Sequence, residues 1–189
     1  GVRAFWWPRF ERIARWFLDQ ERLRRPGLIA CATELKGEMH LPAPEGPFLL
    51  TAKADRIDVL ADGTLAIIDY KTGTPPAKRE VEAGLSPQLP LEAAIAQAKG
   101  FPGLRGARVA ALAYWRLSGG IPPGTIEPIE RGPELVEAAA AGLERLIAAF
   151  DRPETPYLAQ PRPAAAPRYS DYGHLARIKE WSAGAEDEG

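Results

Sequence analysis

The sequence has very little cysteine, since Cys31 is the only one in 189 residues. A disulfide framework is therefore excluded, and so are zinc-finger and iron–sulfur sites built from several cysteines. The sequence also lacks an apolar run near the ~20 residues that a membrane helix requires, and no signal peptide is visible. Charge of neither sign dominates, because 24 Lys and Arg face 25 Asp and Glu. The net charge of −1 is not typical of a nucleic-acid-binding protein, although acidic residues gathered in a metal site can mask basic surface elsewhere.

The remaining composition is that of an ordinary globular protein, with 46% hydrophobic and 26% charged residues. The length suits one domain with appendages. We expect a folded core with an N-terminal helix over residues 1–151, followed by a proline-rich arm and a short helix over residues 152–189. Because the chain begins with Gly1 rather than Met, we also expect it to be a piece of a longer polypeptide.

Hydrophobic periodicity predicts an α/β fold with a mixed central sheet flanked by helices. Helices are expected over residues 5–24, 86–99, 133–150 and 169–181, with Ser86 as the N-cap of the second. Strands are expected over residues 28–41, 48–60, 64–71 and 108–117, and loops over 72–84 and 119–124. Asp62-Gly63 predicts a hairpin between the second and third strands, because glycine adopts the positive φ that such a turn needs.

Charged residues concentrate in the two strands that this hairpin joins. Lys53, Asp55, Arg56 and Asp58 lie in one strand, and Asp69, Tyr70 and Lys71 end the other. Burying an unpaired charge is costly, so these side chains need partners. Either they form a surface ladder of salt bridges or they bind a charged ligand.

The hairpin register decides which carboxylates meet. A three-residue turn over residues 61–63 places Asp55 opposite Asp69, with Cβ atoms roughly 5 Å apart. A two-residue turn instead places Asp58 on that face, as a diagonal neighbour of Asp69. Either register puts one Asp beside Asp69 and Lys71. Two carboxylates and a lysine suit Mg²⁺ or Mn²⁺ and the activation of water for attack on a phosphate.

These residues resemble the RecB-type branch of the PD-(D/E)XK nuclease superfamily. That branch has the pattern G-x-x-D, then D/E-x-K after a hairpin, then Q-x-x-x-Y on the following helix, within a core of order αβββαβ. The matching segments here are Ala52-Lys53-Ala54-Asp55, Asp69-Tyr70-Lys71-Thr72-Gly73 and Gln88. Three further segments are similar to the C-terminal nuclease domains of the AddB family, of the type found in alphaproteobacterial double-strand-break repair complexes: residues 6–10, 33–38 and 86–91.

The resemblance implies roles by position. The metal ligands that it implies are Glu34, Asp55, Asp69 and the carbonyl of Tyr70. It implies that Lys71 is the catalytic lysine and that Gln88 holds the site or the DNA backbone. Its catalytic set is therefore Glu34, Asp55, Asp69, Lys71 and Gln88, and its cofactor is Mg²⁺ or Mn²⁺.

The function implied is a divalent-metal-dependent deoxyribonuclease domain of a helicase–nuclease complex in recombinational double-strand-break repair. The implied partners are an AddA-type helicase–nuclease subunit and the single-stranded DNA produced by unwinding, in the bacterial cytoplasm at the nucleoid and without a membrane. Two alternatives stay open. One is a nuclease fold kept only as a scaffold for binding DNA or a subunit, and the other is a stand-alone nuclease of the CRISPR-associated or restriction type.

The chain departs from the family pattern at four points. Ala52 stands where Gly is usual, and Glu92 stands where Q-x-x-x-Y has Tyr. Many AddB proteins ligate an iron–sulfur cluster through four cysteines, but Cys31 is alone here, so no cluster is expected. Many relatives also carry a metal-binding His before the core, and neither His40 nor His174 is placed like it.

Overall fold

A computed structural model describes residues 2–104, 108–158 and 175 of the chain. The chain divides into two compact units, residues 1–151 and 152–189. In the second unit the described residues 152–158 form turns and irregular backbone. The helix expected over residues 169–181 lies outside the described residues, apart from residue 175.

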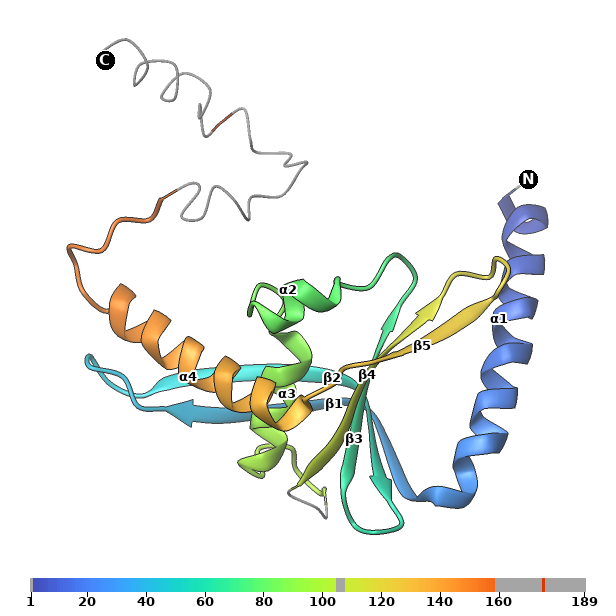
Figure 1. The fold of residues 1–189 in the computed structure, drawn as a ribbon, viewed down its shortest axis with the longest axis horizontal. Helices are drawn as coiled ribbons and strands as arrows, with labels where there is room; N and C mark the ends of the chain where they lie inside the picture. The colour runs from blue at the N-terminus through green and yellow to red at the C-terminus, as the bar shows by residue number, and fades with distance from the viewer. Residues whose placement is uncertain (1, 105–107, 159–174, 176–189) are drawn as a thin grey trace. The chain divides into compact units, whose positions relative to one another are not determined.

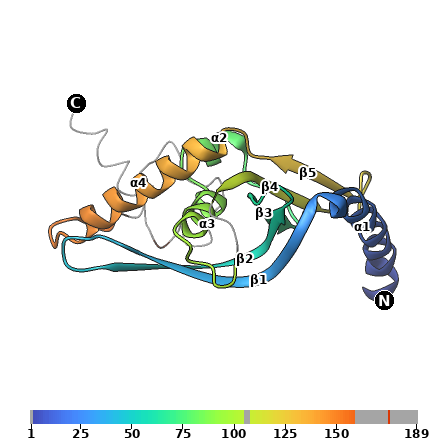
Figure 2. The same cartoon turned by 90° about the horizontal axis from the view of Figure 1, so that it is seen from below.

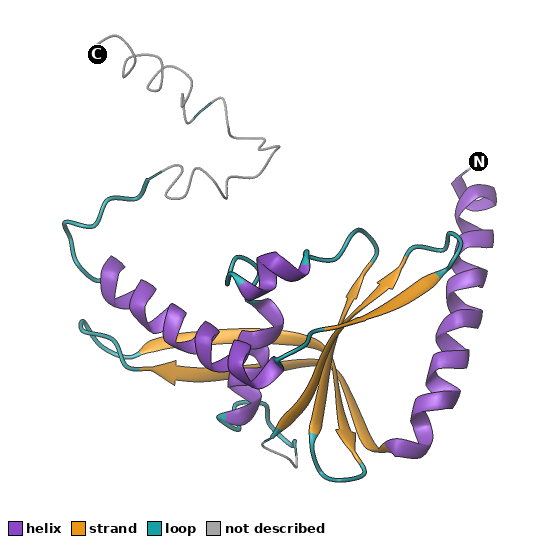
Figure 3. Cartoon of the chain, in the orientation of Figure 1, coloured by secondary structure: helices purple, strands orange, loops and turns teal. Residues whose placement is uncertain are grey.

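The first unit contains all the helices and strands of the described ranges (Figures 1 and 3). They are, in chain order, α1 (Val2–Arg24), the 3-10 helix η1 (Arg25–Gly27), β1 (Leu28–Leu41), β2 (Phe48–Leu60), β3 (Leu65–Lys71), α2 (Lys78–Glu82), α3 (Gln88–Gln97), β4 (Val109–Leu117), β5 (Gly124–Pro128) and α4 (Gly132–Phe150). The predicted α/β class, with a mixed sheet flanked by helices, is confirmed.

The five strands form one sheet in the order β1-β2-β3-β4-β5. Strands β3 and β4 are parallel, whereas the other neighbouring pairs are antiparallel. Helices α2 and α3 form the connection between the parallel strands, and α3 contacts α4 and strands β1 to β4. Figure 2 shows α3 and α4 together over the sheet, with α1 beside its other end. The C-terminal end of β3 lies beside the start of α3, because Gln88 hydrogen-bonds to Asp69, and the middle of β2 reaches the same place through Asp55.

The structure differs from the sequence analysis at three places: one strand was missed and two expectations were wrong. Strand β5 was not predicted, because it is short, ends in Pro128 and owes its conformation to pairing with β4. Helix α2 lies inside the expected loop, because five residues are too few to show a helical period; its Glu80 carboxylate accepts a hydrogen bond from the Ala77 amide at 3.0 Å. Helix α3 begins at Gln88 with Pro87 as the capping residue, so Ser86 is not its N-cap.

The core lies between α3 and the sheet because alternate positions of β2 and β3 are apolar. Its fully buried side chains include Ile57, Leu65, Ile67, Leu89, Ile95 and Leu112. The C-terminal end of α3 is held close to β1 at Gly100, whose carbonyl accepts a hydrogen bond from the Glu38 amide at 3.0 Å. A Cβ at Gly100 would lie 2.0 Å from the Glu38 carbonyl oxygen, so only glycine permits this approach.

The other face of the sheet receives α1 through an aromatic cluster. Trp16 and Phe17 of α1 contact the buried Trp115 of β4, with ring centroids 5.6 and 5.8 Å apart. Tyr70 of β3 completes the cluster at 5.9 Å from Trp115. Side chains of β3 thus alternate between the α1 face and the α3 face. Within the described ranges, no helix is both long and apolar enough to cross a membrane.

Candidate active site

The hairpin between β2 and β3 has a three-residue turn. Val59 pairs with Leu65, and Arg56 pairs with Ile68 in the same register. Gly63 adopts the left-handed conformation with φ of +78°, which favours glycine. Extended by one residue beyond the Arg56–Ile68 pair, this register places Asp55 opposite Asp69, and Asp55 bonds to the adjacent Tyr70 amide. The structure thus decides between the two registers that the sequence left open.

Asp58 lies on the opposite face of the sheet, away from Asp69. Its carboxylate accepts hydrogen bonds of 2.7 Å from Arg56 and from Arg24, and it is fully buried. Burial alone would raise the pKa of Asp58, but the two guanidinium groups outweigh it and the pKa is lowered. The salt-bridge interpretation therefore holds for Arg56 and Asp58, on the α1 face.

Four predicted residues come together where β2 and β3 meet the start of α3. Asp69 is only 2% exposed, and its Oδ1 accepts a hydrogen bond from Gln88 Nε2 at 2.7 Å. Lys71 Nζ lies 2.7 Å from Asp69 Oδ2 as an ion pair and donates a hydrogen bond to Gln88 Oε1 at 3.2 Å. Asp55 Oδ2 accepts a hydrogen bond from the Tyr70 amide at 2.9 Å. The Lys71 side chain keeps 30% of its surface exposed, so it reaches solvent from this cluster.

Glu92 is a fifth member of the cluster. It lies one helical turn beyond Gln88 on α3 and is only 3% exposed. Its Oε1 accepts a hydrogen bond of 3.1 Å from Gln88 Nε2. Burial, together with the charges of Asp69 and Asp55, raises the pKa of Glu92 to about 7. The sequence analysis treated Glu92 only as a departure from Tyr, although the i, i+4 spacing from Gln88 already placed both residues on one helix face.

Chemistry fixes the orientation of the Gln88 amide. An ionised carboxylate only accepts hydrogen bonds, and an ammonium group only donates them. The amide nitrogen therefore faces Asp69 and Glu92, and the amide oxygen faces Lys71. Gln88 links the two carboxylates to the lysine.

Glu34 is not brought into this cluster. Its neighbours in β1, Thr33 and Leu35, pair with Arg56 and Ala54, so its backbone lies across from Asp55. Its φ is +54°, however, and its side chain is 63% exposed and forms an ion pair with Lys53. The described part of the chain contains no group of three or more His, Cys, Asp or Glu side chains able to hold a metal ion. A metal-binding role for Glu34 stays a prediction.

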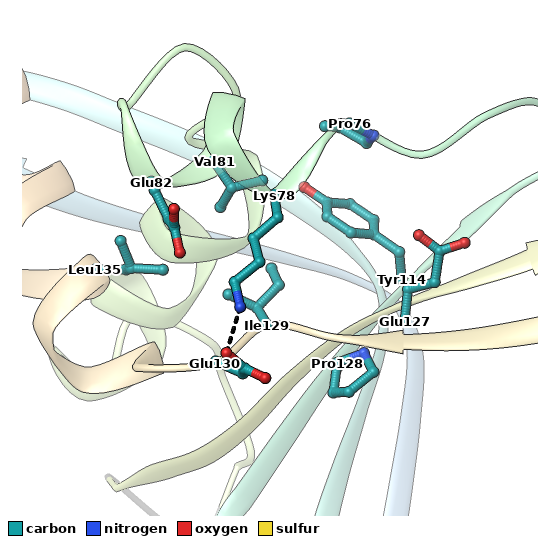
Figure 4. A pocket seen from close by; sticks show the side chains of 10 residues that line it. All are labelled: Pro76, Lys78, Val81, Glu82, Tyr114, Glu127, Pro128, Ile129, Glu130 and Leu135. Atoms are coloured by element: carbon teal, nitrogen blue, oxygen red, sulfur yellow. Dashed lines mark hydrogen bonds and ion pairs between the residues drawn. The ribbon is translucent and has the colours of Figure 1, made fainter.

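A pocket of about 60 Å³ adjoins the cluster at Tyr114 (Figure 4). In the β3–β4 register Tyr114 pairs with Asp69, and Lys71 Nζ lies 5.8 Å from the centroid of its ring. Burial and the charges of Asp69 and Glu92 raise the pKa of Tyr114 to about 12. Val81 of α2 and Leu135 of α4 supply apolar walls, and Figure 4 shows the ion pair between Lys78 and Glu130 beside them.

The donor chemistry fits a hard divalent cation. The carboxylates of Asp55 and Asp69 lie on the face of the sheet that α3 covers, near the start of that helix. Mg²⁺ is commonly held by one or two carboxylates and otherwise by water, so a third direct carboxylate is not required. Cys31 and His40 are both exposed residues of β1. Cys31 pairs with Asp58, whose side chain lies on the α1 face, and His40 pairs with Leu49 near the start of β2.

A comparison with known protein families agrees with this chemistry. Residues 3–166 match the sequence model of a family described as the PD-(D/E)XK nuclease superfamily. The chain is 34% identical over 100 residues to an uncharacterized protein of Rickettsia bellii and to uncharacterized protein RT0391 of Rickettsia typhi. Each alignment covers 53% of this chain but 12% of the relative, so the chain corresponds to a small part of these proteins. A crystal structure of SSO0001 is similar with a TM-score of 0.38 and 12% identity, over 68% of this chain and 56% of that one.

Proposed function

This chain belongs to the PD-(D/E)XK nuclease superfamily, and on that premise we propose that it is a divalent-cation-dependent deoxyribonuclease domain that hydrolyses phosphodiester bonds. One observation carries the proposal. Asp55 lies opposite Asp69, and Asp69, Lys71 and Gln88 form one hydrogen-bonded cluster beside it. An aspartate pair with a lysine whose side chain reaches solvent is suited to phosphodiester hydrolysis.

Asp55 and Asp69 would hold the cation, with the Tyr70 carbonyl and Glu34 as further ligands. A bound Mg²⁺ or Mn²⁺ lowers the pKa of water and stabilises negative charge on a phosphoryl oxygen. The backbone of Glu34 supports its inclusion. A non-glycine residue in the left-handed region costs of order 1 kcal/mol, and such strain is concentrated at functional sites.

Lys71 and Gln88 would supply the remaining functions of the site. The Lys71 ammonium would orient the attacking water and offset charge that develops on the scissile phosphate. Gln88 would keep Lys71 and Asp69 in their relative positions, because its amide binds both. The Lys71 ammonium would then donate hydrogen bonds to the attacking water from a fixed position at the surface of the cluster.

The wider context of the proposal is a helicase–nuclease complex of double-strand-break repair, with this chain as an AddB-type nuclease domain. The segments over residues 6–10, 33–38 and 86–91 support it, as does a match to a small part of much longer relatives. Residues 1–151 would form the nuclease core and residues 152–189 an appended arm, without an iron–sulfur cluster. The partners would be an AddA-type subunit and single-stranded DNA, in the bacterial cytoplasm at the nucleoid.

Cleavage of a labelled single-stranded oligonucleotide in Mg²⁺ or Mn²⁺ tests the activity. We expect EDTA to stop cleavage, and Asp69→Asn and Lys71→Ala each to slow it by ~10²–10⁴-fold, the range typical of lost acid–base and charge-stabilising groups. Asp19→Asn, at an exposed carboxylate on α1, is the control and should cleave like the wild type. Wild-type rates in Asp69→Asn would refute the assignment.

The two alternatives predict different results in the same assay. A scaffold would bind the oligonucleotide without cleaving it, either alone or together with an AddA-type subunit. A stand-alone nuclease would cleave at full rate alone and gain nothing from that subunit. Our proposal predicts cleavage that increases when the subunit is added to the full-length protein.

A further inference from the structure

Glu92 is buried at the cluster, and one of its two carboxylate oxygens lacks a hydrogen-bond partner among the described residues. Its Oε1 accepts the hydrogen bond from Gln88, but its Oε2 has no hydrogen-bond partner in the described part of the chain. Leaving a buried carboxylate oxygen without a partner is costly. A group other than the described residues is therefore expected to meet Glu92 Oε2.

The surroundings of Glu92 favour a positive charge. The Gln88 amide nitrogen binds the carboxylates of both Asp69 and Glu92, and Asp55 binds the backbone amide next to Asp69. Lys71 is the cation that pairs with Asp69. Three carboxylates thus face one ammonium group, and that ammonium is already paired with Asp69. The imbalance favours a further cation at this place over another hydrogen-bond acceptor.

A second unused group lies on the β4 side of the site. The Tyr114 hydroxyl is buried and has no hydrogen-bond partner among the described residues, although Glu92 is close enough to raise its pKa. The two groups do not bond to each other, so a donor and an acceptor both stay unused around the cluster. Water molecules between them would satisfy both groups.

We propose that Glu92 is a further acidic residue of the cation site, which acts on the ion across a water molecule through Oε2. This inference rests on the proposed cation at Asp55 and Asp69. Indirect action is favoured because the Gln88 amide lies between Glu92 and Asp69 and hydrogen-bonds to both carboxylates. Glu92 thus strengthens cation binding without being a direct ligand, and through Oε1 it also holds Gln88.

Binding of Mn²⁺, measured by the electron paramagnetic resonance signal of the free ion, tests this without any nuclease assay. Residues behind the direct ligands typically contribute 10–100-fold to metal affinity, so we expect Glu92→Gln to raise the Kd by at least ~10-fold. Glu92→Asp keeps the charge and should retain part of the affinity. Glu144→Gln removes the same charge from the exposed face of α4 and should leave the Kd unchanged.

A double mutant separates this role from mere support of Gln88. If Glu92 acted only by holding Gln88, adding Glu92→Gln to Gln88→Ala would change nothing further. We expect the double mutant to bind Mn²⁺ still more weakly than Gln88→Ala. Circular dichroism and the Tm establish that each variant is folded.

The outcomes keep the two proposals apart. If Asp69→Asn loses Mn²⁺ binding and Glu92→Gln binds like the wild type, the role of Glu92 is wrong and the cation site stands. If Asp69→Asn binds Mn²⁺ as well as the wild type, the cation site itself is wrong, and the role of Glu92 fails with it.

Discussion

Asp55 and Asp58 occupy the same strand and lie in different surroundings. Three positions apart in β2, they point to opposite faces of the sheet, because successive side chains alternate. Asp55 reaches the Tyr70 amide beside Asp69, whereas Asp58 is enclosed by Arg56 and Arg24. The contacts of an Asp in this strand therefore depend on the face of the sheet to which its side chain points.

Glu92 makes the stability of the metal-free protein depend on pH. Burial first, and then Asp69 and Asp55, raise its pKa from 4.5 to about 7. Between these values the folded protein holds a proton that the unfolded chain has released. The contribution of Glu92 to stability therefore falls as the pH rises through this window, by roughly 3 kcal/mol in all, and stays low above it.

Glu92→Gln removes this titration. Its free energy of unfolding should match that of the wild type near pH 4 and exceed it by roughly 3 kcal/mol near pH 8, measured by urea unfolding in EDTA. The comparison isolates Glu92, because pairs such as Arg56 with Asp58 are present in both proteins. A difference that does not change with pH would contradict the burial of an ionisable Glu92.

At the scale of elements, α3 connects the core to the site. Leu89, Ala93 and Ile95 are buried in the core, while Gln88 donates hydrogen bonds to Asp69 of β3 and to Glu92. The helix is short, so its position depends on its packing and not on its intrinsic propensity. Gly100 lets the C-terminal end of α3 approach β1, so it also helps to set the position of Gln88 at the other end of the helix.

Gly100→Ala tests this link. The new Cβ would lie 2.0 Å from the Glu38 carbonyl oxygen and 2.8 Å from a methyl group of Ile95, so the backbone must move. We expect the free energy of unfolding to fall by ~1–3 kcal/mol, and Mn²⁺ affinity to fall with it as α3 shifts.

Gly142→Ala is the matched control on α4. There the added Cβ meets only the Arg145 guanidinium, at 3.8 Å. Alanine should raise stability by up to ~1 kcal/mol in this helix and leave Mn²⁺ binding unchanged. Equal stability of Gly100→Ala and the wild type would show that β1 and α3 have room to separate.

At the scale of the whole molecule, the described core is confined to the first unit. Every buried hydrophobic residue found in the described ranges lies between Leu41 and Ile147. The five strands and the four α-helices of those ranges also lie in residues 1–151. This unit contains both the sheet and the complete cluster around Asp69.

Residues 1–151 should therefore fold without residues 152–189. We expect the shortened protein to unfold in one cooperative step, with a Tm within about 4 °C of that of the full chain. A shift of that size corresponds to a change of ~1–2 kcal/mol in the free energy of unfolding. Thermal unfolding followed by circular dichroism measures this. A shortened protein without a cooperative transition would show that the second unit is needed for the fold.

The sequence by itself determined the features that depend on neighbouring residues. The bounds of β1 and β2, the hairpin at Asp62-Gly63 and the α/β class followed from periodicity and turn chemistry, and each is present in the structure. The grouping of Asp69, Lys71 and Gln88 could be expected from the family pattern, because strand and helix periods set which side chains share a face.

Only the tertiary structure decided what depends on residues far apart in the chain. It selected the three-residue turn, which placed Asp55 and not Asp58 opposite Asp69. It added β5, which is a strand because β4 lies beside it, and it brought Glu92 against Asp69 through Gln88. The local sequence is compatible with more than one arrangement at each of these three places. The packing of the first unit selects one of them.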